Sequence, residues 1–375
     1  MTLRTMQRIN FFAIALLLLC VYSIGNAQSA NHQRTKIAIV GLVHSHCWGF
    51  VTKLNQMHQN QDLIEIVGIS DDNQELRDYI KTQVPGVPVY DNYAKMLDEK
   101  KPEVVWSFVE NDRHLEVTKA CAARKIHVMF EKPMSATYDE ARQMMAVAKQ
   151  AGIQLMVNYQ MAWWPENYTA HDVAMRGDIG KVWRVRSVIG HGGPGNFEPG
   201  SIKQKYFLKW LSDESRGGGA LIDFTCYGAK WALWYLGLPK TVYAITTHTR
   251  PDVYPSNTNA TVLMSYGDNK VAITEGSWDL PRSFYDVEVF GNKGSVAMKY
   301  PKTLELVIGT EKKPLELGTL DALHSEPIRY FVDCVRNNKP VEGVVSGDFN
   351  VNVMQIVEAA KRSAASGKPI TLPLK

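Results

Sequence analysis

The chain has 375 residues, of which 45% are hydrophobic and 10% aromatic, so it is neither generally disordered nor a small disulfide scaffold. Residues 1–27 hold two arginines and no acid, which leaves a net charge of 40 − 38 = +2 on the rest of the chain. This near balance argues against a nucleic-acid binder, which needs a clustered basic excess. The length predicts about two domains.

The first 27 residues have the pattern of a signal peptide. Arg4 and Arg8 precede an apolar run over 11–25, and small residues stand at both ends of a cleavage site at 25–27. The run is shorter than the roughly 18–20 apolar residues of a membrane anchor. We therefore expect cleavage after residue 27, Sec-type export to the periplasm, and no stable membrane span in the mature chain.

Residues 35–155 alternate short apolar runs with helical patterns. We expect strands at 36–42, 63–70, 87–90, 103–110 and 126–132. We expect helices at 47–58, 73–83, 92–100, 113–125 and 138–152. Apolar strands separated by helices indicate a parallel sheet covered on both faces, here a Rossmann-type dinucleotide-binding domain in an α/β protein.

A second domain is expected over residues 156–345, where apolar and polar residues alternate with period two. The expected strands are 181–191, 240–249, 259–267, 270–278, 284–291 and 294–300, with a helix over 219–237. They predict an α+β domain with a large open antiparallel sheet. Residues 346–375 are expected to form a C-terminal helix and tail that pack back on the first domain.

The turn after the first strand carries a weak dinucleotide signature. A dinucleotide fold needs G-x-G-x-x-G here, but the chain has Gly41-Leu42-Val43-His44-Ser45-His46, which keeps only the first glycine. The helix N-terminus still offers free N–H groups to a phosphate, and either histidine adds a donor. Asp71 closes the second strand, where it accepts the ribose hydroxyls of NAD or merely caps the next helix, and both interpretations stay open.

The clearest chemical signal is Lys132, which ends a buried strand just before a proline. That position lies at the ligand edge of a parallel sheet, where a lysine costs desolvation unless it serves a ligand. Farther along, three glycines at 217–219 precede a helix that carries Asp223 and Tyr227. Their i, i+4 spacing places both side chains on one helix face.

These features resemble the glucose–fructose oxidoreductase/inositol dehydrogenase (Gfo/Idh/MocA) family. The resemblance rests on Glu131-Lys132-Pro133, on Asn111 and His114 after the fourth strand, on the GGGALID segment and on the domain order. It runs from Lys36 to about Leu372, and it implies the fold expected above.

The resemblance implies a catalytic set of Lys132, Asp223 and Tyr227. In the family the lysine contacts the reacting hydroxyl or carbonyl, and an aspartate and a histidine complete the site. A tyrosine in the histidine's place resembles the glucose–fructose branch, where the phenol acts as acid and base. We expect the neighbouring ammonium to lower the pKa of Tyr227 toward neutrality.

The expected cofactor is NAD, with NADP disfavoured because the charge of Asp71 would repel a 2′-phosphate. The residues expected to contact it are Gly41, Val43, His44, Ser45, His46, Asp71, Asn111, His114, Glu131 and Lys132. His191, Trp163 and Tyr159 are expected to contact the substrate. No metal is expected, since the pair His44 and His46 lacks a nearby third ligand.

Three functions compete. The first is an NAD(P)-dependent oxidoreductase acting on a sugar, polyol or glycoside, with tightly held cofactor. The second is a redox-neutral enzyme that uses NAD to cleave or rearrange a glycoside, and the third is a cofactor-free sugar-binding protein of the same fold. The resemblance also implies a homo-oligomer formed through the antiparallel sheet, and nothing in the sequence points to a nucleic acid.

Overall fold

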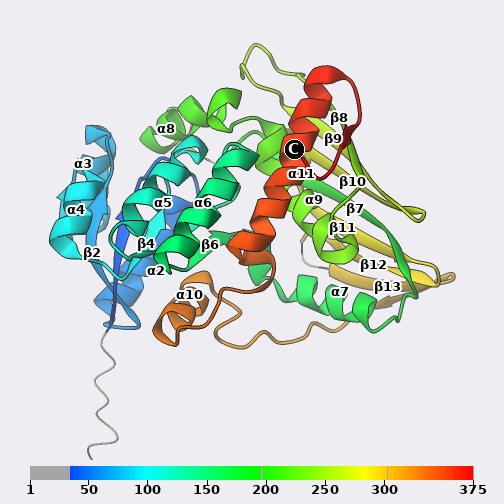
Figure 1. Cartoon of the computed structure of the whole chain (residues 1–375), viewed down its shortest axis with the longest axis horizontal. Coiled ribbons are helices and arrows are strands. Elements are labelled where there is room, and N and C mark those ends of the chain that lie inside the picture. Colours follow the sequence, from blue (N-terminus) through cyan, green and yellow to red (C-terminus); the bar gives the residue numbers. More distant parts are fainter. Residues whose placement is uncertain (1–33, 196, 302, 375) are drawn as a thin grey trace, which may run out of the picture.

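The computed structural model describes residues 34–195, 197–301 and 303–374, which form two sheets with helices packed on them (Figure 1). The expected signal peptide lies outside the described residues. The first sheet has six parallel strands in the order β3-β2-β1-β4-β5-β6, which is the order of a doubly wound nucleotide-binding fold. The strands are β1 (Thr35–Val40), β2 (Ile64–Ser70), β3 (Val89–Tyr90), β4 (Val104–Ser107), β5 (His127–Glu131) and β6 (Leu155–Asn158).

Helices cover both faces of this sheet, so β4 is buried throughout and β1 is buried and apolar from Ile37 to Val40. The last helix before β6 begins at a capping box of Thr137 and Glu140 and ends at Gly152 in the left-handed conformation. The helices are α2 (Cys47–Gln59), α3 (Gln74–Gln83), α4 (Tyr93–Lys100), α5 (His114–Ala122) and α6 (Tyr138–Ala151).

The second sheet has nine strands in the order β14-β13-β12-β11-β7-β10-β9-β8-β15. It is largely antiparallel, and the pair β7–β10 runs parallel. The strands are β7 (Val182–Gly192), β8 (Thr241–Thr247), β9 (Asn259–Gly267), β10 (Lys270–Ser277), β11 (Asp279–Gly291), β12 (Gly294–Lys299), β13 (Thr303–Ile308), β14 (Glu311–Pro314) and β15 (Ile370–Thr371).

Helix α9 (Ala220–Leu236) covers the inner face of this sheet and packs on β7 and β10. Helix α11 (Gly347–Ser366) lies between the two halves of the molecule, against α6 on one side and against α9 and β8 on the other (Figure 1). The remaining helices are α7 (Pro165–Met175), α8 (Ile202–Leu211) and α10 (Pro327–Arg336).

The predicted fold class is confirmed, with differences in detail. The strand expected over 103–110 ends at Ser107, because the chain then turns into a short 3₁₀ helix, η1 (Asn111–Arg113). The strand expected from residue 284 begins at Asp279. The prediction also missed β6, α7, α8, β13, β14, α10 and β15.

The contact between α9 and the second sheet is close enough to exclude a side chain at Gly228. A Cβ there would lie 1.8 Å from Thr274 Oγ1 and 2.7 Å from Ser187 Oγ. We predict that Gly228→Ala destabilises the protein by about 1–3 kcal/mol through overpacking. Gly49→Ala in α2 is the control, since no atom lies within 4 Å of its Cβ and it should stabilise by about 0.5–1 kcal/mol. Urea unfolding measures both, and equal effects would contradict this account of the contact.

Candidate active site

A cavity of about 210 Å³ lies where the carboxyl ends of the parallel strands meet the second domain. It brings together seven of the predicted site residues from four separate parts of the chain, namely His44, Ser45, His46, Lys132, His191, Asp223 and Tyr227. Its other lining residues are Gln160, Gly195, Phe197, Phe207, Phe224 and Tyr285.

At the centre of the cavity Lys132 and Asp223 form a buried ion pair. Lys132 Nζ donates to Asp223 Oδ1 and, at 2.9 Å, to the Asp223 carbonyl oxygen. Burial alone would disfavour both charges, but each stabilises the other, so the pKa of Lys132 is raised and that of Asp223 is lowered. Trp278 Nε1 donates to Asp223 Oδ2 at 2.9 Å and completes the carboxylate's partners. The site therefore holds a fixed ammonium at the mouth of β5.

The glycines before α9 allow its first turn to approach this point. A Cβ on Gly218 would lie 2.0 Å from the Leu211 carbonyl oxygen, and Gly219 has φ +90°. Asp223 then falls in the first turn of α9, where the helix dipole favours a carboxylate. The glycines that precede Asp223 in the sequence are therefore required by close packing in the structure.

Tyr227 follows one turn later, but its predicted titration is wrong. Burial raises the pKa of Tyr227 well above its usual value. Lys132 Nζ lies 5.2 Å from the centroid of the Tyr227 ring, over its face, and its charge is neutralised by Asp223. The ammonium therefore does not stabilise a phenolate at this position.

His46 is held by a buried carboxylate. Its Nδ1 lies 2.8 Å from Glu131 Oε2, while Glu131 Oε1 accepts from Asn158 Nδ2 at 2.7 Å and from Trp106 Nε1 at 3.3 Å. Glu131 is fully buried, so it does not reach the cavity itself. Glu131 instead contacts His46, which lies between it and the cavity.

The other two cavity histidines differ from His46. His44 accepts a hydrogen bond from the His46 backbone N–H through Nδ1, and burial together with the charges of His46 and Lys132 lowers its pKa well below the usual value. Burial also lowers the pKa of His191, whose ring meets Phe224 edge-on. Both therefore favour the neutral ring.

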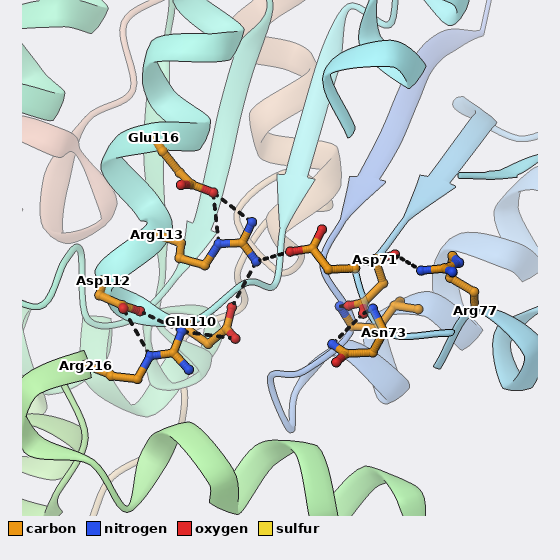
Figure 2. Close-up of polar contacts among 10 residues, drawn as sticks. Asp71, Asn73, Arg77, Glu110, Asp112, Arg113, Glu116 and Arg216 are labelled. Atoms are coloured by element: carbon orange, nitrogen blue, oxygen red, sulfur yellow. Dashed lines mark hydrogen bonds and ion pairs between the residues drawn. The ribbon is translucent and has the colours of Figure 1, made fainter. Parts of the chain in front are cut away.

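A second hollow lies in front of β1 and β2, lined among others by Gly41, Val43, Asp71, Asp72 and Arg113. Gly41 has φ +84°, and its missing Cβ admits Val109, so this glycine is required by the turn itself. Asp71 Oδ2 accepts from the Leu42 backbone N–H at 2.7 Å. Its Oδ1 accepts from the backbone N–H and the side-chain amide of Asn73 (Figure 2). Asn73 is itself the N-cap of α3, so Asp71 makes no capping bond to that helix, and its contact with a ribose stays a prediction.

An ion-pair network borders this hollow and joins the two halves of the chain (Figure 2). Arg113 Nη1 lies 2.7 Å from Asp72 and 3.5 Å from Glu110. Arg216, which belongs to the second half of the chain, lies 3.2 Å from Glu110 and 3.1 Å from Asp112. Glu110, which lines the hollow, is therefore held by one arginine from each half of the chain.

The strand ends have the polar groups that a dinucleotide needs. Three buried polar atoms there find no hydrogen-bond partner among the described residues, namely Ser70 Oγ, Ser107 Oγ and Asn111 Oδ1. Buried polar groups are normally satisfied, so an unpartnered atom beside a hollow, as at Ser70, fits a ligand with hydroxyl, amide or phosphate groups. Ser70 lines the hollow beside Asp71.

Several predicted site residues lie outside the cavity. Trp163 donates through Nε1 to Asn158 Oδ1 at 2.7 Å and packs against Tyr330. Tyr159 is fully buried behind Tyr227, with 5.3 Å between ring centroids. The expectation that these two residues contact the substrate is therefore not supported by their positions.

Asn111 and His114 are also buried. Asn111 Nδ2 donates to the Gly217 carbonyl oxygen at 2.8 Å, which ties η1 to the glycine segment before α9. His114 Nδ1 lies 3.0 Å from the Met134 carbonyl oxygen, and its ring stacks on Phe130. Both side chains therefore hold the turn after β4 in place.

Sequence reasoning missed several residues of the site. Trp278 orients Asp223, and Phe207, Phe224 and Tyr285 supply aromatic walls. Tyr285 lies on β11 among part-buried neighbours, and Phe207 lies on α8, a helix that was not expected. No local motif marks Trp278, Phe207 or Tyr285, and Gln160 has none because the strand before it, β6, was not predicted. Phe224 carries a signal, since it directly follows Asp223 in the glycine-led helix.

The described residues contain neither a metal-binding cluster nor a membrane-spanning helix. Residues 34–374, apart from 196 and 302, contain no group of three or more His, Cys, Asp or Glu side chains placed to hold a metal ion. Within the same ranges no helix has both the length and the apolar character to cross a bilayer. The four cysteines in these ranges are free and buried.

The fold and the site together define an NAD(P)-dependent oxidoreductase of the Rossmann type. A family model described as "Oxidoreductase family, NAD-binding Rossmann fold" matches residues 35–159, and the "GFO/IDH/MocA C-terminal domain" matches residues 168–297. The chain belongs to the Gfo/Idh/MocA family.

Among curated relatives, D-xylose 1-dehydrogenase (NADP(+)) 2 of Haloferax volcanii is 26% identical over 295 residues, covering 76% of this chain and 86% of that protein. D-glucoside 3-dehydrogenase of Escherichia coli is 24% identical over 230 residues, covering 61% and 58%. Among solved structures, the aldose–aldose oxidoreductase of Caulobacter crescentus superposes with a TM-score of 0.76 at 20% identity, covering 91% of this chain and 100% of that one. The structural likeness supports the fold.

Removing one member of a buried ion pair leaves the other charge uncompensated. We predict that Lys132→Met destabilises the protein by about 3–5 kcal/mol, and that adding Asp223→Asn recovers part of this loss because the charges then leave together. Urea unfolding of the two single variants and the double variant measures the coupling. Additive losses in the double variant would show that the two groups do not interact in solution.

Proposed function

We propose that the protein oxidises an alcohol carbon of a sugar, polyol or glycoside, or reduces the matching carbonyl, with a tightly held NAD. The observation that carries this proposal is the buried Lys132–Asp223 pair in a cavity with aromatic walls. An ammonium fixed at one point stabilises the negative charge that develops on a reacting oxygen. Phe197, Phe207 and Tyr285 offer flat apolar faces to the C–H groups of a sugar ring.

The chain's own residues supply binding, orientation and charge. Asp223 and Trp278 hold the Lys132 ammonium, so Lys132 can donate to the substrate oxygen without moving. The strand ends at Ser70, Ser107 and Asn111 would hold the cofactor. When bound, the nicotinamide accepts or returns a hydride.

The preference for NAD over NADP rests on the charge of the second hollow. Asp71, Asp72 and Glu110 face it with Arg113, so carboxylates outnumber cations there. Arg113 is already engaged by Asp72, Glu110 and Glu116. A 2′-phosphate would meet net negative charge, and calorimetry with both nucleotides should show tighter binding of NAD.

The segment 1–27 supports export, and an exported enzyme has no pool of free nucleotide to draw on. A cofactor that stays bound would solve this problem. Mature protein from the periplasm should begin at Gln28 and release near-stoichiometric nicotinamide nucleotide on denaturation, as measured by mass spectrometry. Empty protein that also binds no NAD would favour the cofactor-free sugar binder instead.

The outer face of the second sheet supports a homo-oligomer. Ile245 on β8 and Leu263 on β9 point to the same face and are 53% and 41% exposed. A second copy of the chain would cover these apolar side chains. Light scattering of the mature protein should give more than one subunit per particle, and a monomer at micromolar concentration would oppose this part of the proposal.

The function is tested with Lys132→Arg, which keeps the charge beside Asp223 but replaces a compact ammonium by a planar fork. With NAD and a panel of aldoses, polyols and glycosides, we predict a loss of turnover of about 10²–10³-fold and near-normal nucleotide affinity. Lys125→Arg, an exposed lysine at the end of α5, is the matched control. Nicotinamide absorbance reports net oxidation. Sugar consumed without net NADH would indicate the redox-neutral alternative, and full activity of Lys132→Arg would remove Lys132 from the site.

A further inference from the structure

We propose that His46 is the proton-transfer residue of this site, set in one tautomer by Glu131. The inference rests on the proposed function and deepens it. It starts from the imidazole of His46, which lines the same cavity as Lys132 and Asp223 and is hydrogen-bonded to a fully buried carboxylate. Imidazole paired with a carboxylate is a common arrangement for moving a proton.

A directional chain of hydrogen bonds stands behind His46. Trp163 Nε1 can only donate, and it donates to Asn158 Oδ1 at 2.7 Å. The Asn158 amide is thereby oriented with Nδ2 toward Glu131 Oε1, at 2.7 Å. Trp106 Nε1, also a pure donor, points at the same oxygen from 3.3 Å. Glu131 Oε1 is therefore used by two donors, and Oε2 is left for His46.

This chain determines where the proton of neutral His46 lies. A carboxylate oxygen accepts hydrogen bonds, so the contact of 2.8 Å requires Nδ1 of His46 to carry the hydrogen. Nε2 then keeps its lone pair as the basic nitrogen of the ring. His46 is part-exposed, with 27% of its side chain accessible, so this ring reaches the cavity.

The other groups of the cavity are poorly suited to accept a proton. Lys132 is already protonated, and the oxygens of Asp223 are occupied by Lys132 and Trp278. The Tyr227 hydroxyl resists ionisation because the residue is buried. His44 spends Nδ1 on the His46 backbone N–H. His46 has both the free nitrogen and the carboxylate behind it.

During oxidation, His46 accepts the proton that the alcohol loses. A bound oxidised nicotinamide would accept the hydride of the alcohol carbon, and Nε2 of His46 takes the hydroxyl proton, while Lys132 stabilises the oxygen as the carbonyl forms. The imidazolium that results is stabilised through Nδ1–H by Glu131. In the direction of reduction, the same imidazolium returns the proton to the oxygen.

The decisive variant is Glu131→Gln. Trp106 and Asn158 both need an acceptor, so the glutamine oxygen must face them, and its NH₂ group then faces His46 Nδ1. Nδ1 becomes an acceptor, and the hydrogen of the neutral ring moves to Nε2. The substitution thus preserves shape and packing but reverses the tautomer.

Nitrogen-15 NMR of histidine-labelled mature protein reads the tautomer without substrate. We expect His46 to carry its hydrogen on Nδ1 in the natural protein and on Nε2 in Glu131→Gln. His58 and His127 are internal references of the opposite kind, because their Nδ1 atoms accept backbone hydrogen bonds from Ile66 and Gln154. Hydrogen on Nε2 of His46 in the natural protein, or an unchanged ring in Glu131→Gln, would overturn the proposal.

Turnover is the second readout. His46→Gln and Glu131→Gln should each lower turnover by about 10²–10⁴-fold. The double variant should lose little more, because the two residues act as a unit. Affinity for NAD should change by less than about threefold, because His46 transfers a proton and is not the main group that holds NAD. Glu103→Gln, a surface carboxylate near His127, is the matched control.

Two results would overturn this role for His46. One is turnover of His46→Gln above about a tenth of the natural rate, and the other is a loss that appears entirely as weaker NAD binding. If the natural protein transfers no hydride to or from any sugar, the proposed function fails. The tautomer measurement needs no substrate, so it tests the pairing of His46 with Glu131 separately from the proposed function.

Discussion

The buried ion pair of Lys132 and Asp223 is the constraint on which the arrangement of the two domains depends. Lys132 directly follows β5 of the first sheet, whereas Asp223 lies in the first turn of α9, which packs on the second sheet. Two charges taken out of water are tolerated only with good geometry and further hydrogen bonds. Trp278 and the Asp223 carbonyl oxygen supply them, so the pair ties the end of β5 to α9 at the cavity.

Glu131 and Lys132 are neighbours in sequence but serve different parts of the site. Lys132 turns toward α9, whereas Glu131 turns back toward β4 and β6, where Trp106 and Asn158 donate to it. Alternation of side chains at the end of a strand sends neighbours to opposite sides. A single strand end therefore supplies a fixed cation to the centre of the cavity and a fixed anion behind His46.

The sequence predicts the parallel sheet well because uniform apolar runs such as β1 leave few alternatives. It predicts Lys132, Asp223 and the glycines before α9 because each stands in an unusual context for its residue type. Helix α7 escapes prediction, since Glu166 and Asn167 are buried and break the amphipathic pattern. Contacts between distant elements, such as Trp278 with Asp223, leave no local trace.

The predicted roles of Tyr227 and Trp163 also depended on tertiary contacts that the sequence does not reveal. A lysine near a tyrosine suggests a lowered pKa, but the sign depends on burial and on which other charge the lysine already serves. Here burial raises the pKa of Tyr227, and Lys132 serves Asp223. Trp163 has the right chemistry for a sugar platform, yet its N–H is committed to Asn158. These choices are made by tertiary structure.

The incomplete glycine motif gains a physical meaning in this context. Gly41 has φ +84°, so the turn requires a glycine there. His46 has φ −68° and ψ −21°, an ordinary helical conformation that any residue adopts, so a glycine at that position serves close approach rather than the backbone. A side chain placed there reaches Glu131 and the cavity at once. The departure that weakens the dinucleotide signature in the sequence is thus the one that creates the histidine–carboxylate pair.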